Sequence, residues 1–221
     1  MSRVFDPVTT TRWDHDRVAP ELVRRAAALP AATLHEAAGR IGALPPGLKP
    51  VAPAFRIAGS VVTVVCPNGD NLWIHRALCA AQPGDVLVVQ TGDGADYGYW
   101  GEVMSTAARA RHLGGLVIDG CVRDAPLLRE IGFPVFARGL AIRGTVKDLG
   151  AMGWVNAPLL LGDVAIAPGD LIVGDEDGLV ALPAQGLDAV LAAATAREAK
   201  EAAMCEALMA GALTLDLMGL R

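Results

Sequence analysis

Residues 98–124 decide the fold of this chain, and they read GYWGEVMSTAARARHLGGLVIDGCVRD. The stretch passes from a glycine-rich loop into a predicted helix at 102–113 and a buried strand at 115–120, and it ends in a polar turn. Open α/β sheets bind ligands beyond the carboxyl ends of their strands, which is where this turn lies. The stretch therefore predicts an α/β fold with a ligand site at this edge of its sheet.

Helical and strand-like segments alternate on both sides of this stretch. The β-branched run at 58–66 predicts a strand because such residues fit a buried sheet. The other predicted strands are 86–90 and 133–139, and the predicted helices are 20–29, 32–41, about 69–81 and 125–132. Alternation of this kind favours a layered α/β domain with mixed sheets.

The second half of the chain is predicted to be rich in short strands. Glycine, proline and aspartate divide residues 141–183 into brief apolar runs, and the last two runs predict a hairpin joined at Asp175–Gly178. A long helix with few breakers follows at 186–211. We therefore expect an N-terminal extension at 1–19, a main domain at 20–185, and a C-terminal helix and tail at 186–221. The helix either packs along its own domain or reaches a neighbouring subunit.

The composition excludes several classes of protein. Of the 221 residues, 52% are hydrophobic and 19% are charged, which is enough to bury a core and excludes a disordered chain. The net charge of −5 without a basic patch argues against a nucleic-acid ligand. The four cysteines form no C-x-x-C pair, which indicates reduced thiols and no thiolate zinc site. With neither a signal segment nor a membrane span, we expect a soluble cytoplasmic protein.

The spacing of three polar residues indicates a site. Twenty residues separate Glu102 from Arg123, about one helix and one strand, so the chain returns to the same edge of the sheet and brings Asp124 with it. Arg123 offers a planar fork for a carboxylate or enolate oxygen, and Asp124 is a hard ligand for Mg²⁺ or Mn²⁺. From residue types alone two alternatives stay open: an ordinary Arg-Asp turn, or Asp124 as the N-cap of the next helix.

The helix that begins near Glu102 adds a second element to this site. The backbone N–H groups of its first turn, at Gly101, Glu102, Val103 and Met104, are free to bind an anion such as a carboxylate.

At these residues the chain resembles the RraA-like family, which includes the 4-hydroxy-4-methyl-2-oxoglutarate and 4-carboxy-4-hydroxy-2-oxoadipate aldolases. The family's signature is an acidic residue, twenty intervening residues and then Arg-Asp, here Glu102 and Arg123-Asp124. Further similar stretches are ATLHEAAGR (32–40), GDNLWIH (69–75), GDEDGLVALP (174–183) and MAGALTLDL (209–217). The family usually has Asp where this chain has Glu102, and the extra methylene moves the carboxylate by about 1.5 Å.

The resemblance implies a fold, an activity and an assembly. The fold would be an α/β/β/α sandwich of the swivelling β/β/α type with a long C-terminal helix, assembled as a trimer or a pair of trimers. The activity would be metal-dependent cleavage of a 4-hydroxy-2-oxo acid to pyruvate, together with oxaloacetate decarboxylation. The family also contains non-catalytic regulators that bind a ribonuclease or an RNA helicase, and these resemble a shorter version without the long helix.

The resemblance also implies a role for each site residue. Asp124 would coordinate Mg²⁺ or Mn²⁺, Glu102 would orient water on the metal, and Arg123 would contact the pyruvyl group. The amides from Gly101 to Met104 would bind the substrate carboxylate. A glutamate from the C-terminal helix of a neighbouring subunit would complete the site, either Glu201 or Glu198.

Other polar residues suggest less specific roles. His35 and Glu36 lack the second histidine of an H-E-x-x-H zinc site, so Glu36 is either a cleft wall or a surface carboxylate. His75 is predicted to be a packed or capping histidine. The acidic run at 175–177 is predicted to be a hairpin turn, and Cys121 an inert thiol. Schiff-base chemistry is not favoured, because no lysine lies in an apolar stretch; the lysines are Lys49, Lys147 and Lys200.

Overall fold

The computed structural model describes residue 12 and residues 14–221 of the chain. The predicted N-terminal extension at 1–19 therefore falls mostly outside the described residues.

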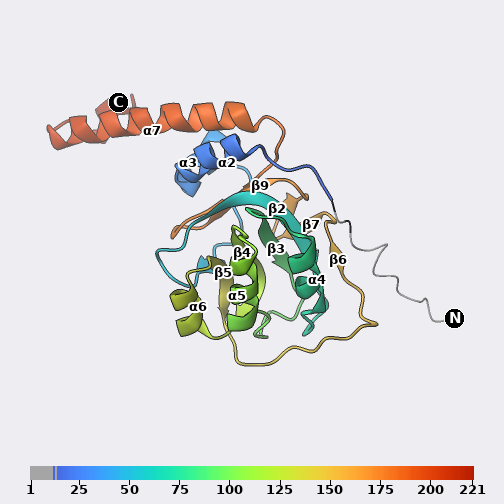
Figure 1. Ribbon diagram of the computed structural model, residues 1–221. Helices are drawn as coiled ribbons and strands as arrows, with labels where there is room; N and C mark the ends of the chain where they lie inside the picture. Colours follow the sequence, from blue (N-terminus) through green and yellow to red (C-terminus); the bar gives the residue numbers. More distant parts are fainter. Residues whose placement is uncertain (1–11, 13) are drawn as a thin grey trace.

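One curled sheet organises the fold (Figure 1). Its central strands β2, β3, β4 and β5 pair in parallel, and antiparallel strands extend both edges. The strand order is β1 (Lys49–Pro50), β5 (Val135–Leu140), β4 (Gly115–Val122), β3 (Val86–Gln90), β2 (Ile57–Val65), β9 (Leu171–Gly174) and β10 (Leu179–Leu182). The short β6 (Trp154–Val155) pairs with β2, and β7 (Leu159–Leu161) pairs with β8 (Val164–Ile166) in a separate hairpin.

The nine-residue strand β2 belongs to both halves of this sheet. Residues 57–60 pair with β9, whereas residues 61–65 pair with β3. Gly59 lies at the crossover, where an added Cβ would meet the carbonyl oxygen of Gly84 at 2.4 Å. The two halves face each other across a core to which β2, β3, β9 and β10 all contribute, including Val61, Val88 and Ile172. The sheet thus forms two β layers from one continuous ladder.

Helices cover the outer face of each β layer (Figure 1). On one face α4 (Leu72–Ala80), α5 (Glu102–Ala110) and α6 (Ala125–Ile131) share a core with β2–β5. On the other face α2 (Pro20–Ala27), α3 (Ala31–Ala37) and α7 (Leu187–Met209) pack against β9 and β10. The order of layers is α/β/β/α, which confirms the fold predicted from the sequence.

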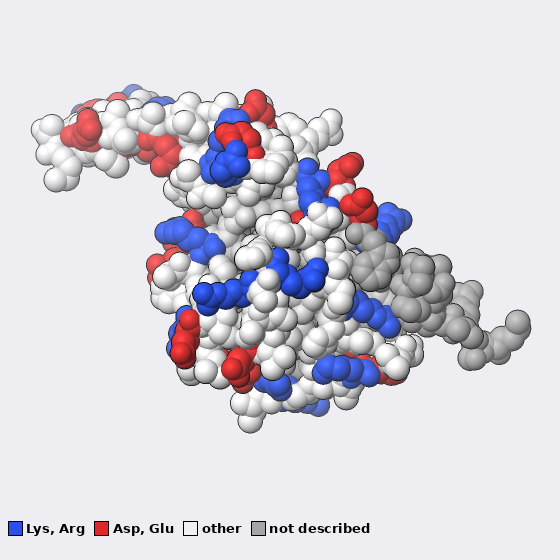
Figure 2. Space-filling view, viewed as in Figure 1, with Lys and Arg blue, Asp and Glu red and all other residues white. Residues whose placement is uncertain are grey.

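The long C-terminal helix is present, and only its first half is anchored. Its buried residues are Leu187, Leu191 and Ala194. Beyond them α7 extends past the body of the molecule, with the short α8 (Thr214–Leu217) folded back at its end (Figure 1). Much of the projecting end is uncharged (Figure 2), and its exposed apolar residues are Met209, Leu213, Leu215, Leu217, Met218 and Leu220. None of the described helices combines the length and the apolar character needed to cross a membrane.

Several predicted element boundaries were wrong by one or more residues, and three of them have a clear local reason. The second helix ends at Ala37 instead of 41, because Gly39 and Arg40 adopt positive φ angles of 79° and 65°. Helix α5 ends at Ala110, since His112 has φ 58° and turns the chain toward β4. Strand β4 continues through Val122, two residues further than predicted, because residues 121 and 122 still pair with β5.

A buried ion pair fixes the segment before α2 to the sheet. Asp85 is 2% exposed at its side chain and accepts hydrogen bonds from Nε and Nη2 of Arg17, both at 2.9 Å, and from the amide of Gln82 at 2.8 Å. Arg17 also contacts Asp14, whose side chain is 88% exposed.

We expect Asp85→Ala to lower the free energy of unfolding by about 3 kcal/mol, because it leaves a partly buried guanidinium and a partly buried amide without their acceptor. Asp14→Ala, the matched control on the same arginine, should change it by less than about 1 kcal/mol. Urea unfolding of both variants measures the difference. Equal losses would show that the buried pair does not anchor this segment.

Candidate functional site

The loop before α5 lies directly on Arg123 and Asp124. The amide of Arg123 donates to the carbonyl of Trp100 at 2.8 Å, which holds the loop against the end of β4. An added Cβ on Gly98 would lie 3.2 Å from Cβ and Cδ of Arg123, and one on Gly101 would lie 2.3 Å from Oδ2 of Asp124. The φ of Gly101 is −157°, an extended value that any residue can adopt. Glycine is therefore required by the lack of space beside Asp124 and not by its backbone angle.

Asp124 connects the turn after β4 to the start of α5. Its Oδ2 accepts a hydrogen bond from the amide of Glu102 at 3.1 Å and lies 3.6 Å from Nε of Arg123. Its backbone is left-handed, with φ 61° and ψ 32°, a conformation that few residues other than glycine, asparagine and aspartate adopt readily. Asp124 precedes α6, yet its side chain makes no capping hydrogen bond there. Asp124 is therefore the N-cap residue of α6 by position only, and its carboxylate instead faces the N-terminus of α5.

The first turn of α5 retains donors for an anion. The amide of Glu102 is occupied by Asp124, whereas no acceptor is recorded among the described residues for the amides of Val103 and Met104. The positive end of the helix dipole also lies here, which favours bound negative charge. The Glu102 side chain is exposed at the same helix end. The backbone of Gly101 and Glu102 thus lies against Arg123 and Asp124, and Val103 and Met104 follow within the first turn of α5.

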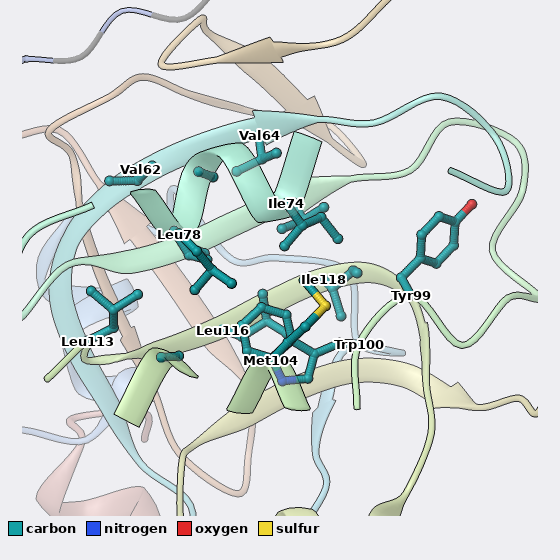
Figure 3. Packing of buried hydrophobic residues seen from close by; sticks show 14 of the residues in the cluster. Val62, Val64, Ile74, Leu78, Tyr99, Trp100, Met104, Leu113, Leu116 and Ile118 are labelled. Atoms are coloured by element: carbon teal, nitrogen blue, oxygen red, sulfur yellow. The ribbon is translucent and has the colours of Figure 1, made fainter. Parts of the chain in front are cut away.

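Two aromatic residues hold the loop in place, and the sequence did not single them out. The Tyr99 hydroxyl accepts from the amide of Gly69 at 2.8 Å and donates to the carbonyl of Gly94 at 2.7 Å. The Trp100 indole donates to Oγ of Ser105 at 2.6 Å and stacks on Phe133. Figure 3 shows Trp100 and Met104 within the core and the Tyr99 ring directed the other way. The sequence feature that could have identified them is an aromatic pair inside a glycine-rich loop.

A hollow of about 500 Å³ opens beside Arg123 and Asp124. It lies between the start of α6 and the end of β5, where Leu140 is the last residue of the strand and Ile142 lies just beyond it, both exposed. Its volume falls within the usual range of small-molecule sites. The hollow leaves Arg123 and Asp124 accessible to a ligand. It also has room for parts of that ligand that these two side chains do not contact.

The two glutamates considered on the C-terminal helix lie on the other side of the molecule. Glu201 pairs with Nε of Arg197 at 2.8 Å, and Glu198 accepts from the hydroxyl of Thr33. The first contact lies within α7 and the second joins α7 to α3, over the β9–β10 layer and away from α5 and α6 (Figure 1). Within one chain neither glutamate meets Asp124, so a contribution from them requires a second copy.

The remaining candidate residues have structural partners. Glu36 pairs with Arg197, and Nδ1 of His35 lies 2.9 Å from the carbonyl of Ile41. Burial lowers the pKa of the half-buried His75 and raises the pKa of the Cys121 thiol, so each group is held toward its neutral form. The residues at 175–178 form the predicted hairpin turn, closed by the amide of Asp175 on the carbonyl of Gly178. No lysine lines the hollow among the described residues.

The donor set at this site suits a metal ion that needs few protein ligands. Within the described part of the chain, no three His, Cys, Asp or Glu residues gather closely enough to enclose a metal. Asp124 is a hard oxygen donor that lines an open hollow, and Glu102, whose amide bonds to it, carries a second carboxylate on the same helix end. Mg²⁺ and Mn²⁺ favour such oxygens, and Mg²⁺ commonly retains several of its waters. The residues therefore fit a hydrated divalent ion.

Comparison with known proteins identifies the family. A family model described as Aldolase/RraA matches residues 19–181. The chain belongs to the RraA-like family. A protein of Halalkalibacterium halodurans, provisionally named 4-hydroxy-4-methyl-2-oxoglutarate aldolase, is 32% identical over 194 residues, which are 86% of this chain and 91% of the relative.

Solved structures share this RraA-like fold. An uncharacterized protein from Pseudomonas syringae matches with a TM-score of 0.81 and 27% identity, over 94% of this chain and 97% of that one. Streptomyces coelicolor RraAS2, described as an unusual member of the RNase ES inhibitor RraA protein family, matches with a TM-score of 0.75 and 28% identity, over 85% and 97% of the two chains. Chain length therefore does not by itself separate the aldolases from the inhibitor relatives.

The role of Tyr99 can be tested by removing its hydroxyl. We expect Tyr99→Phe to lower the free energy of unfolding by about 1–3 kcal/mol, because a buried amide and a buried carbonyl lose their partner. Tyr97→Phe is the matched control: its ring packs on Tyr99 and on Arg143, and no partner of its hydroxyl is recorded in the described part of the chain. Thermal and urea unfolding measure both variants. A Tyr99→Phe variant as stable as the control would contradict this role.

Proposed function

We propose that this chain is a divalent-metal-dependent pyruvate aldolase that cleaves a 4-hydroxy-2-oxo acid, such as 4-hydroxy-4-methyl-2-oxoglutarate, and also decarboxylates oxaloacetate. The observation that carries the proposal is the contact of Asp124 with both Arg123 and the first turn of α5, next to the hollow that Arg123 and Asp124 line. The name of the Halalkalibacterium relative supports the same reaction class.

The metal is part of this proposal. Asp124 would hold Mg²⁺ or Mn²⁺, with Glu102 directed at its water shell. The bound ion supplies Lewis-acid stabilisation of the negative charge that develops on the 2-oxo oxygen during C–C cleavage.

The protein's own side chains and backbone amides account for the binding and orientation of the substrate. Arg123 and the amides of Val103 and Met104 bind the carboxylate and oxo oxygens of the pyruvyl end, as a guanidinium fork and helix N-terminal donors do for anions. The hydrogen bond from Glu102 to Asp124 fixes the carboxylate before the substrate arrives. This preorganisation spares the site a rearrangement when negative charge develops.

A general base starts the cleavage. Glu102, or Glu201 from the C-terminal helix of a neighbouring copy, accepts the proton of the C4 hydroxyl. The C3–C4 bond then breaks, C4 becomes a carbonyl carbon, and the electron pair passes to C3 and the 2-oxo oxygen. Protonation at C3 gives pyruvate. Because Glu201 and Glu198 lie away from Asp124 within one chain, we expect a homo-oligomer, a trimer or a pair of trimers, acting in the cytoplasm.

A second candidate is a non-catalytic regulator that binds a ribonuclease or an RNA helicase. The observation in its favour is the similarity to the RNase ES inhibitor family member over 85% of this chain. A protein-binding role needs neither a metal nor the Arg-Asp pair. Pyruvate release followed with lactate dehydrogenase, from 4-hydroxy-4-methyl-2-oxoglutarate and from oxaloacetate, with and without EDTA, separates the two functions. Release that stops with EDTA and returns with Mg²⁺ supports the enzyme, whereas no release from either substrate refutes it.

The sharpest single variant is Asp124→Asn. Asparagine tolerates the left-handed backbone and keeps an oxygen for the amide of Glu102, so the fold should survive while the charge is lost. We expect pyruvate formation to fall by about 100-fold or more, the scale on which removal of one electrostatic contact to the transition state acts.

The matched control for that variant is Glu130→Gln, which removes an exposed carboxylate from α6, the helix that Asp124 precedes. It should retain wild-type activity and Mg²⁺ dependence. If Asp124→Asn keeps full activity in the same coupled assay, the assignment of Asp124 is wrong.

Gly101 tests whether the close approach of the loop matters for activity. A methyl group at this position would overlap Oδ2 of Asp124, so we expect Gly101→Ala to displace the carboxylate and reduce kcat/KM by about tenfold or more. Gly47→Ala is the control, because its new Cβ would meet nothing within 4 Å and its φ is not positive. Unchanged kinetics in Gly101→Ala would show that the spacing does not set the site geometry.

A further inference from the structure

One buried side chain joins the start of α4 to the segment that carries the candidate site. Asn71 immediately precedes α4 and is 6% exposed. Its Nδ2 donates to the carbonyl oxygen of Tyr99 at 2.9 Å and, more weakly, to Sδ of Met104 at 3.7 Å. These two contacts lie on either side of the stretch of backbone that approaches Asp124.

The side chain of Asn71 does not cap its own helix. Asn71 occupies the N-cap position of α4, where an asparagine oxygen commonly accepts a hydrogen bond from the first turn. Its side chain makes no such bond, and its Oδ1 is buried with no partner in the part of the chain that the structure describes. A buried polar atom without a partner lowers the stability of a fold. The geometry of Asn71 therefore favours the loop before α5 over the stability of α4.

The backbone of Asn71 is held by its surroundings. Its amide donates to the carbonyl of Val146 at 3.2 Å, and its carbonyl accepts from the amide of Ile74 at 3.1 Å. The amide of Gly69, two residues earlier, donates to the Tyr99 hydroxyl. Asn71 is therefore a fixed point against which the carbonyl of Tyr99 is placed.

The loop that contains Tyr99 is also bonded to the end of β4. The Tyr99 amide donates to the carbonyl of Cys121 at 3.1 Å. The next carbonyl, that of Trp100, accepts from the amide of Arg123 at 2.8 Å. The loop thus lies between Asn71 on one side and the turn of the Arg-Asp pair on the other. Loss of the contact with Asn71 would let the loop and the first turn of α5 shift relative to that pair.

We propose that Asn71 is a positioning residue of the reaction. It acts through Tyr99 and Met104, and it holds the first turn of α5 where its amides bind the substrate carboxylate and support Asp124. This inference rests on the proposed aldolase function and adds to it a residue outside the lining of the hollow. A displacement of about 1 Å in such a segment can reduce catalysis by about 100-fold.

A second buried asparagine supplies a matched control. Asn156 is 1% exposed, its Nδ2 donates to the carbonyl of Arg12 at 2.7 Å, and its Oδ1 likewise has no partner among the described residues. Its amide donates to the carbonyl of Thr63, and neither partner belongs to the candidate site. Its φ of 59° is one that aspartate tolerates. Asn71→Asp and Asn156→Asp therefore remove the same donor from two buried positions, of which only Asn71 contacts the loop before α5.

Kinetics of the two variants test the inference on the full-length protein with saturating Mg²⁺. The assays are run at about pH 8, which favours the ionised form of each new carboxyl group. With 4-hydroxy-4-methyl-2-oxoglutarate we expect Asn71→Asp to lower kcat by about tenfold or more and to change KM by less than about threefold, because Arg123 still binds the carboxylate. Asn156→Asp should keep the kcat and KM of the wild type.

Hydrogen–deuterium exchange provides a readout that does not depend on activity. In Asn71→Asp we expect the peptides that contain the amides of Tyr99 and Arg123 to exchange about tenfold faster or more, while exchange in β2 stays unchanged, because only the loop is released. A general loss of stability would raise exchange in β2 as well. Asn156→Asp should leave the exchange of the loop unchanged.

The outcomes separate the inference from the function beneath it. Equal kcat in Asn71→Asp and Asn156→Asp overturns the inference and leaves the aldolase proposal standing. A wild-type protein that releases no pyruvate overturns both. If Asn71→Asp does not fold, Asn71→Leu decides the question, since leucine fills a similar space, lacks the donor and also removes the buried oxygen that has no partner.

Discussion

The structure depends on one constraint, the membership of β2 in both halves of the curled sheet. Residues 57–60 of this strand hydrogen-bond to β9 and residues 61–65 to β3, so a single backbone couples the two β layers. The close approach of Gly59 to the carbonyl of Gly84 leaves no room for a side chain at the crossover. Each layer then offers an outer face, one to α4–α6 and one to α2, α3 and α7. The separation of the Arg-Asp site from the C-terminal helix follows from this arrangement.

Local sequence patterns predicted most elements of the fold. The β-branched run of β2 and the apolar run of β4 were recognised, as was the uninterrupted helix α7. The curl was not accessible from local pattern, because the pairing of β2 with β9 joins residues more than one hundred positions apart. Helix ends were misplaced where Arg40 and His112 take left-handed backbones, a choice that no period in the sequence signals.

The sequence predicted which residues form the candidate site, but it did not predict the contacts that hold them in place. The spacing of Glu102 and Arg123 indicated convergence, and the chain indeed returns to the same sheet edge. What the spacing could not give is the contact of Asp124 with the start of α5, since Asp124 also occupies an ordinary N-cap position. Nor could it give the anchoring by Tyr99, whose two partners lie in separate loops. Such contacts depend on side-chain placement in three dimensions.

The left-handed backbone of Asp124 has a consequence for how this scaffold can change over evolution. The residues that tolerate such a backbone best are glycine, asparagine and aspartate, and a single nucleotide exchange converts an aspartate codon into one for either of the others. A lineage could therefore lose its acid at this position with little damage to folding. The same fold would then persist without that acid and be available for recruitment as a binding protein.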